Sequence, residues 1–426
     1  MLHDLIAPGA SLSVLPRDLM SQGYDGLGRV GNTLIKNLHT TSIRENRKIK
    51  PTNKSLNYHS PSKTIEIKMK LKETQRLELP PSADMHVHLR QGQLMDLVVP
   101  SIRKGGVDTV FVMPNLQPPV TTVAQVLEYK SKLQALDPEV TYLMSLYLHP
   151  SVTPAVITEA AAAGVTGVKM YPQGVTTNSE AGAGADFLEA FSSVFAEMER
   201  HDMVLNLHGE VPGVAPSEDL SLEEAFLPEL HRLHAKFPNL RVVLEHCSTA
   251  AAIDAVKACG PTVAGTITAH HLYLTGDDSE VDPHAFCKPI PKKPKDRDAL
   301  LKAAASGNPK FFFGSDSAPH LLPTKSNKPA PAGVFTQPFA TQLVLLALEA
   351  AVERGAIDEA DVTQEHLEQF LSRAGRRFYK LPEPAAGRIV LERKGDKIPA
   401  SIKSDDGAVE VGISKAGADV FTLQWV

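Results

Sequence analysis

Eight short apolar segments recur along residues 82–315, and most of them are separated by a segment with helical periodicity. The apolar runs are nearly continuous rather than alternating, which is typical of parallel strands covered by helices. Eight such units predict an α/β protein built as a closed (β/α)8 TIM-type barrel. The predicted strands are residues 83–89, 107–113, 141–148, 165–171, 203–208, 240–246, 262–268 and 311–315.

A doubly wound open sheet is the alternative to the barrel. Such a sheet carries a glycine-rich phosphate-binding turn after its first strand, and this chain has the sequence MHVHLRQG there instead. The barrel is therefore the favoured architecture. Helices are predicted at residues 182–201, 222–236, 296–305, 338–354 and 363–379, and short strands from Gly387 onward predict a cap on the barrel.

The first 68 residues differ in composition from the rest of the chain. They hold ten Lys or Arg against five Asp or Glu and few long apolar runs. We predict a disordered N-terminal extension over residues 1–68 and a barrel domain over residues 69–426, with its C-terminal cap from about residue 380. The extension lacks the apolar core of a signal peptide, and its acidic residues argue against a transit peptide. We expect a cytoplasmic protein, with organelle targeting by this segment as the alternative.

Charge and cysteine content narrow the classes of partner. A net charge of −5 gives no electrostatic reason to expect nucleic acid or an anionic membrane as a partner. The three cysteines show no CxxC spacing, which disfavours a disulfide framework and a thiolate zinc site. No apolar stretch reaches the length of a transmembrane helix. A small-molecule substrate is therefore the expected partner.

Histidines and one aspartate follow the ends of several predicted strands, and in a barrel all of these ends open on one face. His86 and His88 are separated by one residue, so both imidazoles point to the same side of the first strand. His208 and His246 end the fifth and sixth strands, and Asp316 follows the eighth. Four imidazoles and a carboxylate suit zinc, which predicts a metal hydrolase.

Lys169 interrupts the otherwise apolar fourth strand. A buried ammonium is costly, so burial would lower the pKa of this lysine and favour the neutral amine. A neutral amine can react with CO₂ to give a carbamate, which is a carboxylate that can bridge two metal ions. The alternative is a lysine whose ammonium reaches solvent along its flexible stem.

Several motifs resemble those of dihydroorotases, most closely the class II, monofunctional type, within the amidohydrolase superfamily. The resemblance runs from about residue 71 to the C-terminus and has no counterpart in the first 68 residues. The HxH and Asp pieces are shared across the superfamily, whereas VKMYP followed by TTNS, and SDSAPH, are more specific. The motifs are, in order, HVHLR, MPN, VKMYP, TTNS, NLHGE, LEHCS and GSDSAPH.

The resemblance implies a binuclear zinc enzyme that interconverts N-carbamoyl-L-aspartate and L-dihydroorotate in pyrimidine synthesis. It implies that His86, His88 and Asp316 hold one zinc ion. The other ion would be held by His208 and His246, and N6-carboxylated Lys169 would bridge the two ions. Asp316 would also be catalytic, moving a proton between water and the ring nitrogen. The resemblance further suggests a homodimer.

Substrate contacts are also implied by the resemblance. Arg90 offers a rigid fork of donors for the carboxylate outside the ring, and Asn115 and His320 match the positions that assist it. Thr176 and Thr177 lie in a loop, residues 173–184, that resembles a mobile segment closing over substrate. Backbone contacts are expected at Ala285 and at Ala332 with its neighbour Gly333.

Two alternative functions stay open at this point. Another cyclic amidase, such as a dihydropyrimidinase or hydantoinase, would act on substrates without the ring carboxylate, so Arg90 and Asn115 distinguish it. A non-catalytic relative that keeps the barrel as a scaffold would be expected to lose ligand residues, and all six proposed ligands are present.

Overall fold

The computed structural model describes residues 70–213, 220–384 and 387–426, all within one compact unit. The disordered extension predicted for residues 1–68 lies outside the described residues.

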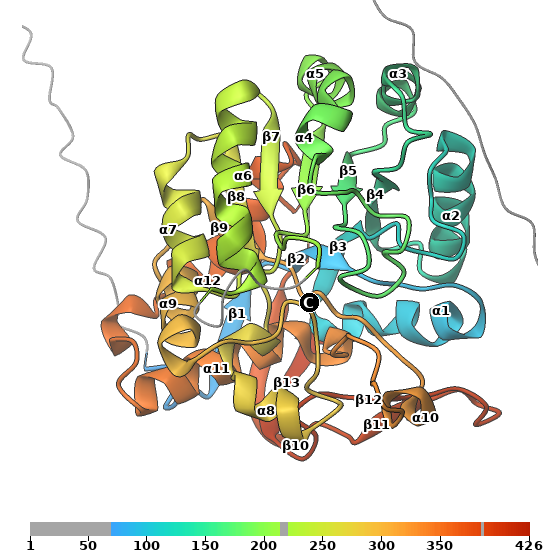
Figure 1. Ribbon diagram of the computed structural model, residues 1–426. Helices are drawn as coiled ribbons and strands as arrows, with labels where there is room; N and C mark the ends of the chain where they lie inside the picture. Colours follow the sequence, from blue (N-terminus) through green and yellow to red (C-terminus); the bar gives the residue numbers. More distant parts are fainter. Residues whose placement is uncertain (1–69, 214–219, 385–386) are drawn as a thin grey trace, which may run out of the picture. The chain divides into compact units, whose positions relative to one another are not determined.

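Eight parallel strands form one sheet in the sequential order β2 to β9 (Figure 1). A parallel bridge joins Val87 at the end of β2 to Ser317 after β9, so the sheet nearly closes on itself. The TIM-barrel prediction is confirmed, and the eight predicted strands appear in their predicted places. The strands are β2 Ser82–Val87, β3 Val107–Val112, β4 Thr141–Tyr147, β5 Gly167–Met170, β6 Val204–Leu207, β7 Arg241–Leu244, β8 Val263–Ile267 and β9 Phe311–Phe313.

Helices follow the strands and lie outside the barrel (Figure 1). Their apolar faces are buried against the strands, for example at Leu133 and Leu233. They are α1 Gly92–Val98, α2 Val123–Leu136, α3 Pro154–Ala162, α4 Phe187–Ala190, α5 Ser192–Arg200, α6 Leu222–Lys236, α7 Ala250–Ala258, α9 Pro294–Ala305 and α11 Ala340–Glu353. Two short helices without such a face, α8 Gly276–Val281 and α10 Leu322–Lys325, belong to the segments after β8 and β9.

Two predicted helices differ in extent from the observed ones. The segment 182–201 becomes helical only at α4, because Gly182 lies in a turn where a Cβ would come within 2.6 Å of the Tyr171 carbonyl oxygen. The segment 363–379 is divided into α12 Gln364–Glu368, a π-helical turn Gln369–Arg373 and α13 Ala374–Phe378. Such π turns often mark functional positions.

The C-terminal strands pair with a segment that precedes the barrel. β10 Ile389–Lys397 lies between β1 Arg76–Leu79 and β13 Asp419–Trp425, and all pairs are antiparallel. A separate hairpin consists of β11 Ser401–Lys403 and β12 Glu410–Gly412. The short C-terminal strands were predicted, but β1 was not, since its partners lie more than 300 residues further along the chain.

The strand ends position the site. β6 stops one residue before His208, β7 two residues before His246 and β9 three residues before Asp316. Asp84 on β2 accepts hydrogen bonds from the backbone and hydroxyl of Ser315, at 2.7 and 2.6 Å. Asp84 therefore fixes the turn that carries Asp316.

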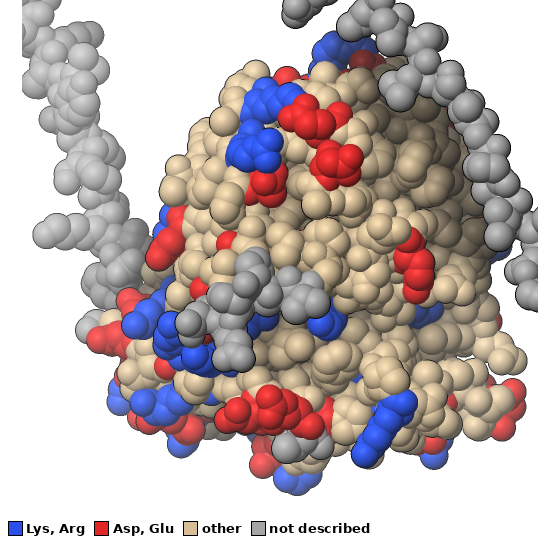
Figure 2. All heavy atoms as spheres, in the orientation of Figure 1, with Lys and Arg blue, Asp and Glu red and all other residues tan. Residues whose placement is uncertain are grey.

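The surface shows no concentration of one charge on the face in view. In Figure 2 basic and acidic side chains both occur, mainly toward the edges of this face, and its centre is formed mostly by other residues. Among the described helices, none has both the length and the apolar character needed to cross a membrane.

Candidate active site

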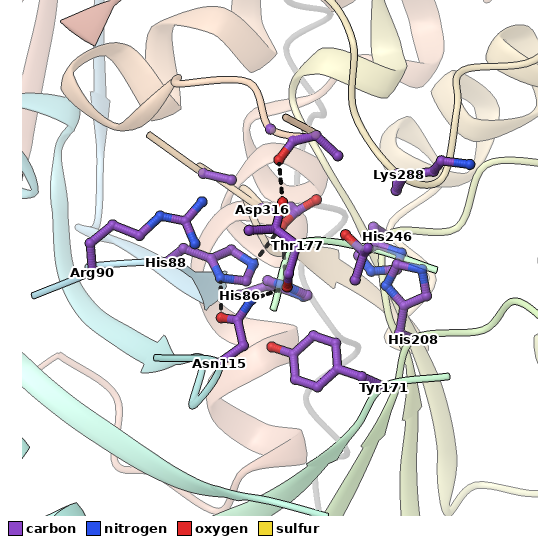
Figure 3. A pocket seen from close by; sticks show the side chains of 14 residues that line it. His86, His88, Arg90, Asn115, Tyr171, Thr177, His208, His246, Lys288 and Asp316 are labelled. Atoms are coloured by element: carbon purple, nitrogen blue, oxygen red, sulfur yellow. Dashed lines mark hydrogen bonds and ion pairs between the residues drawn. The ribbon is translucent and has the colours of Figure 1, made fainter. Parts of the chain in front are cut away.

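A small cavity opens at the carboxyl ends of the barrel strands (Figure 3). Most residues predicted from the sequence line it, although they come from separate strands and loops. Tyr171, Lys288 and Ala318 line it as well. The predicted residues in the lining are His86, His88, Arg90, Asn115, Thr176, Thr177, His208, His246, Asp316, Ala332 and Gly333.

The four histidines and Asp316 lie close together in this cavity. Asp316 Oδ1 is 3.0 Å from Nε2 of His88 and 3.3 Å from Nε2 of His86. The imidazole centroids of His86 and His246 are 5.1 Å apart, and those of His208 and His246 are 4.5 Å apart. Ligand atoms of His86, His246 and Asp316 all lie within 4.8 Å of one another. This donor set fits a zinc centre.

Hydrogen bonds assign the ring nitrogen that His86, His88 and His208 can offer to a metal. His86 donates from Nδ1 to Glu245 at 2.8 Å, and His88 donates from Nδ1 to Asn115 at 2.8 Å. Both therefore present Nε2. His208 is reversed, because its Nε2 donates to Glu210 at 2.8 Å and leaves Nδ1 free. A second nitrogen fixed by a hydrogen bond is the usual arrangement of metal-binding histidines.

Lys169 on β5 is fully buried, and its Nζ has no hydrogen-bond partner. Burial lowers the pKa of this lysine to about 8, and the nearby carboxylates of Glu245 and Asp316 oppose that shift. A buried amine without a hydrogen-bond partner carries a free-energy cost, and a bound ligand or a chemical modification of the amine would remove that cost.

Three site residues adopt left-handed backbone conformations. The φ angles are +60° at Arg90, +40° at His246 and +45° at Asp316. This region costs a non-glycine residue roughly 1–2 kcal/mol. Such strain is concentrated where the surrounding structure aims a side chain at a functional position.

Burial keeps three of the four imidazoles neutral; it would also lower the pKa of His86, but Glu245 and Asp316 raise that pKa above its usual value. It lowers the pKa of His88 to about 4, and it holds the pKa of His208 and His246 below the usual value. Asp316 behaves in the opposite way: burial would raise its pKa, but His86 and His88 hold it well below the usual range. Neutral imidazoles and an ionised carboxylate are the protonation states that bind a metal.

Arg90 lies on one side of the cavity, opposite Lys288 (Figure 3). Arg90 Nε donates to the carbonyl of Pro319 at 3.0 Å, and its Nη2 is 3.3 Å from Nε2 of His320. His320 does not line the metal cavity but borders an adjoining cavity that Arg90 and Asn115 share. Burial lowers the pKa of His320 to about 3, so its imidazole is neutral.

The loop over residues 173–184 is connected to the site by hydrogen bonds. Asn115 Nδ2 donates to the Thr177 carbonyl at 3.0 Å, and Thr177 Oγ1 donates to the Ala332 carbonyl at 3.2 Å. Asn178 Nδ2 donates to the Asn115 carbonyl at 2.9 Å. Asn115 therefore contacts both a histidine of the cluster and the loop above it.

Ala285, unlike His320, lies away from the metal cavity and from the cavity that adjoins it. It is buried and lines a separate cavity with Tyr273 and Ser414, and it is absent from the lining of the metal cavity. Its carbonyl accepts a hydrogen bond from Ser279, and its N–H donates to the Asp282 carbonyl. Both of its backbone groups thus have partners within the chain.

Sequence reasoning did not assign roles to Tyr171, Lys288, Glu210 or Glu245. The first, third and fourth of these stand inside the VKMYP, NLHGE and LEHCS motifs, so their positions beside proposed ligands were the available signal. Lys288 had no such signal, because the loop after α8 brings it to the cavity only in the folded chain.

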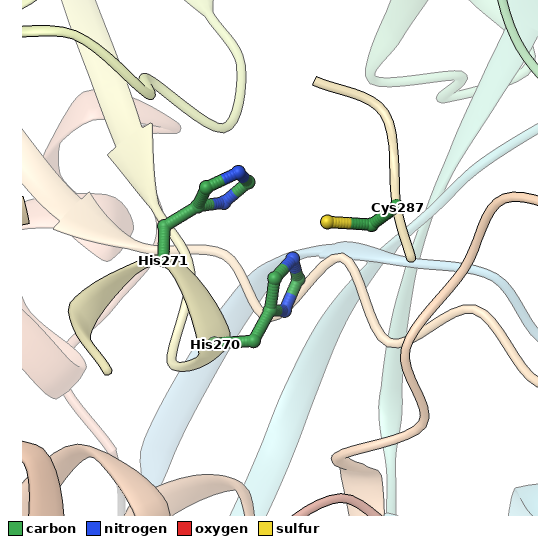
Figure 4. A group of neighbouring side chains, drawn as sticks. All are labelled: His270, His271 and Cys287. Carbon is green, nitrogen blue, oxygen red and sulfur yellow. The ribbon is translucent and has the colours of Figure 1, made fainter. Parts of the chain in front are cut away.

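A second cluster consists of His270, His271 and Cys287 (Figure 4), whose ligand atoms lie within 4.8 Å of one another. Nδ1 of His271 is 2.8 Å from the Thr268 hydroxyl, and its Nε2 donates to the Pro289 carbonyl at 3.0 Å. Because both ring nitrogens of His271 have protein partners, only His270 and Cys287 of this cluster are left as possible metal ligands.

Comparisons with known proteins agree with this geometry. The family model described as Amidohydrolase matches residues 83–381. A protein named "Probable dihydroorotase" from Schizosaccharomyces pombe is 50% identical over 330 residues, covering 77% of this chain and 94% of the relative. A dihydroorotase from Saccharomyces cerevisiae is 44% identical over 370 residues, covering 82% of this chain and 99% of the relative.

A solved structure shows the same relationship in three dimensions. The crystal structure of dihydroorotase from Saccharomyces cerevisiae, in complex with 5-fluoroorotic acid, superposes with a TM-score of 0.76 at 43% identity. The match covers 83% of this chain and 99% of that one. With a barrel, a histidine–aspartate cluster and relatives of this similarity, the chain belongs to the dihydroorotase family of the amidohydrolases.

Proposed function

We propose that this dihydroorotase interconverts N-carbamoyl-L-aspartate and L-dihydroorotate at a centre that holds two zinc ions. The observation that carries the proposal is the convergence of four imidazoles and Asp316 on one cavity, above a buried Lys169 amine without a partner. Zinc accepts such nitrogen and oxygen ligands.

The residues that would hold the metals divide into two sets. His86, His88 and Asp316 are proposed for one ion, and His208 and His246 for the other. Lys169, carboxylated by CO₂ on its neutral amine with loss of one proton, would bridge them. When bound, the two ions supply Lewis-acid polarisation of the amide carbonyl and lower the pKa of water.

Asp316 moves the proton in the proposed reaction. In the ring-opening direction water adds to the amide carbonyl carbon, and the bond from that carbon to the ring nitrogen breaks. The Asp316 carboxylate takes a proton from the water and delivers it to the nitrogen that leaves. Ring closure follows the same steps in reverse.

Arg90 is proposed to bind the carboxylate outside the ring, because its planar guanidinium matches a carboxylate and it lies at the edge of the cavity. His320, Asn115, Thr176, Thr177 and the backbone at Ala332 would complete the substrate contacts. Ala285 would contribute only after a rearrangement, since its backbone groups are occupied.

The test is an assay for ring opening of L-dihydroorotate, with and without a metal chelator. We expect activity in the untreated enzyme, loss of activity after chelation and its return when zinc is added. The purified enzyme should contain close to two zinc ions per chain. Activity that survives complete metal removal would contradict the proposal.

Assembly is proposed from the resemblance, and location from the composition of the sequence. We propose a homodimer, which light scattering on the purified full chain would test, and a cytoplasmic location, which microscopy of the tagged full chain would test. A monomer in solution, or import into an organelle, would contradict the respective proposal.

A further inference from the structure

Glu245 is a fully buried glutamate next to the proposed ligand His246. It follows β7, and its side chain points into the barrel beneath the histidine cluster rather than lining the cavity. An ionised carboxylate in such a place is stable only when donors surround it. The reaction described above gives it no part.

Three strands supply donors to this carboxylate. Oε2 accepts from Nδ1 of His86 at 2.8 Å and from the Thr266 hydroxyl at 2.5 Å. Oε1 accepts from Nδ2 of Asn206 at 2.5 Å, and the same nitrogen lies 2.6 Å from the Tyr379 hydroxyl. The carboxylate is thus fixed from β2, β8 and β6, and Tyr379 extends the network to the segment after α13.

The arrangement has a direct consequence for His86. In the neutral imidazole that binds a metal, donation from Nδ1 to a carboxylate leaves the lone pair on Nε2, the nitrogen that faces Asp316 at 3.3 Å. His88 has the same orientation but pairs with a neutral amide, that of Asn115. The two histidines of the HxH motif therefore have partners of different charge.

We propose that Glu245 is a positioning residue of the metal centre. Its carboxylate, held in place by Asn206 and Thr266, orients His86 and makes Nε2 of His86 a stronger ligand. The inference rests on the proposed two-metal function. It adds that the metal ion at His86 is retained only when Glu245 supports this histidine. Loss of such a partner typically lowers metal affinity about 10- to 100-fold.

The first experiment compares zinc affinity in Glu245→Gln and in the wild-type holoenzyme, by competition with a chromophoric chelator. The single amide oxygen of the glutamine can accept a hydrogen bond either from His86 or from Asn206. When it accepts from His86, the amide hydrogens of the glutamine face those of Asn206. We expect one of the two zinc ions to bind about 10- to 100-fold more weakly. Glu223→Gln is the matched control, because Glu223 is equally buried and contacts none of the proposed ligands. Its zinc affinity should equal that of the wild type.

A double variant, Glu245→Gln with Asn206→Asp, keeps the net charge of the network but moves the carboxylate away from His86. The glutamine amide can donate to the new aspartate while its oxygen accepts from His86. We expect thermal stability close to that of the wild type but zinc affinity that is still reduced. Wild-type zinc affinity in this variant would show that the carboxylate beside His86 is not needed and would overturn the inference.

Cobalt provides a second readout. In Co²⁺-substituted enzyme the visible absorption bands report coordination geometry, and we expect them to change in Glu245→Gln but not in Glu223→Gln. Equal zinc affinities and spectra in wild type and Glu245→Gln would overturn this inference alone. A wild-type enzyme that binds no zinc would overturn the proposed function, and the inference with it.

Discussion

At the scale of single residues, Lys169 and Arg90 decide what the cavity can do. Lys169 is a buried amine without a hydrogen-bond partner, with a pKa lowered to about 8 by burial. This lowered pKa makes the neutral amine accessible near neutral pH, and only the neutral amine can react with CO₂ to form the carbamate. Arg90 keeps a charged guanidinium beside the histidine cluster, where a substrate carboxylate can reach it.

Replacing Lys169 tests the bridge. Lys169→Ala removes the only group proposed to span the two metals, so we expect activity to fall at least about 1,000-fold and zinc content to drop. Short carboxylates such as formate or propionate should restore part of the activity by occupying the space. The measurements are turnover with and without added carboxylate, and zinc content. Full activity in the variant would exclude the bridge.

Replacing Arg90 tests substrate recognition. Arg90→Ala should raise the KM for L-dihydroorotate about 10- to 100-fold, because a hydrogen-bonded charge pair contributes roughly 1.5–3 kcal/mol. Uncharged dihydrouracil, which lacks the carboxylate, serves as the control and should be turned over poorly by both enzymes. Comparable wild-type turnover of the two substrates would instead favour a dihydropyrimidinase.

At the scale of elements, the loop over residues 173–184 lies closed on the site through side chains of its own. Asn178, with a φ of +56°, donates to the Asn115 carbonyl and accepts from Gln117 Nε2 at 2.7 Å. Thr177 contacts the Ala332 carbonyl from the same loop. The loop thus covers the cavity and connects two separate parts of its rim.

Loss of the Asn178 side chain should open this loop. Two hydrogen bonds of about 1 kcal/mol each are removed in Asn178→Ala, so we expect kcat/KM to fall about 10-fold or more. Hydrogen exchange over residues 173–184 should become faster. Gln173→Ala is the control within the same loop, since among the described residues the Gln173 side chain donates only to the Glu180 carbonyl. Unchanged exchange in Asn178→Ala would contradict the assignment.

The start of α6 gives a pH-dependent prediction. Burial raises the pKa of Glu223 to about 7, opposed by Lys292 and by hydrogen bonds from Thr249 and Ser248. The folded state binds this proton more tightly than the unfolded state, so its stabilising effect is complete below about pH 4.5 and is lost as the pH rises through about 7. The loss is about 3 kcal/mol.

Glu223→Gln removes this titration. Between pH 4.5 and above pH 7, the wild type should lose about 3 kcal/mol of unfolding free energy through Glu223, and the variant should not. The stability of the variant relative to the wild type should therefore rise by this amount over the same pH range. Denaturant unfolding at several pH values measures the difference between the two proteins. A difference that stays constant with pH would show that Glu223 has an ordinary pKa.

At the scale of the whole molecule, the barrel is closed by interactions between its first and last strands. His88 N–H donates to the Ser317 carbonyl at 3.0 Å and Asp316 N–H donates to the His86 carbonyl at 2.8 Å. The proposed ligands therefore stand on both sides of the closure. A bound metal would connect β2 with the segment after β9 and stabilise the closed barrel.

Metal removal should accordingly destabilise the fold. A ligand present at 100 times its Kd stabilises the native state by about 2.7 kcal/mol, so the zinc-loaded enzyme should melt several degrees higher than the stripped one. Calorimetry of both forms, and of the stripped form after zinc is added back, measures the shift. Identical melting temperatures would contradict metal binding at the barrel closure.

The amino-acid sequence was enough to predict the barrel and most of the residues that line its cavity. Continuous apolar strands determine the fold class, and residues at strand ends must gather on one face, so His86, His88, His208, His246 and Asp316 could be chosen without coordinates. The sequence could not predict where the helix within residues 182–201 begins, because a turn around Gly182 determines it. Nor could it predict the strand β1, whose partner strand lies far along the chain.

Only the tertiary structure decided which side chain contacts which. The pairing of Glu245 with His86, the contacts of Asn115 with both His88 and Thr177, and the arrival of Lys288 at the cavity depend on the relative positions of neighbouring strands and loops. The same positions turn Ala285 away from the cavity. Strand periodicity fixes the side to which a residue points, whereas hydrogen-bond partners across a barrel follow from its closure and register.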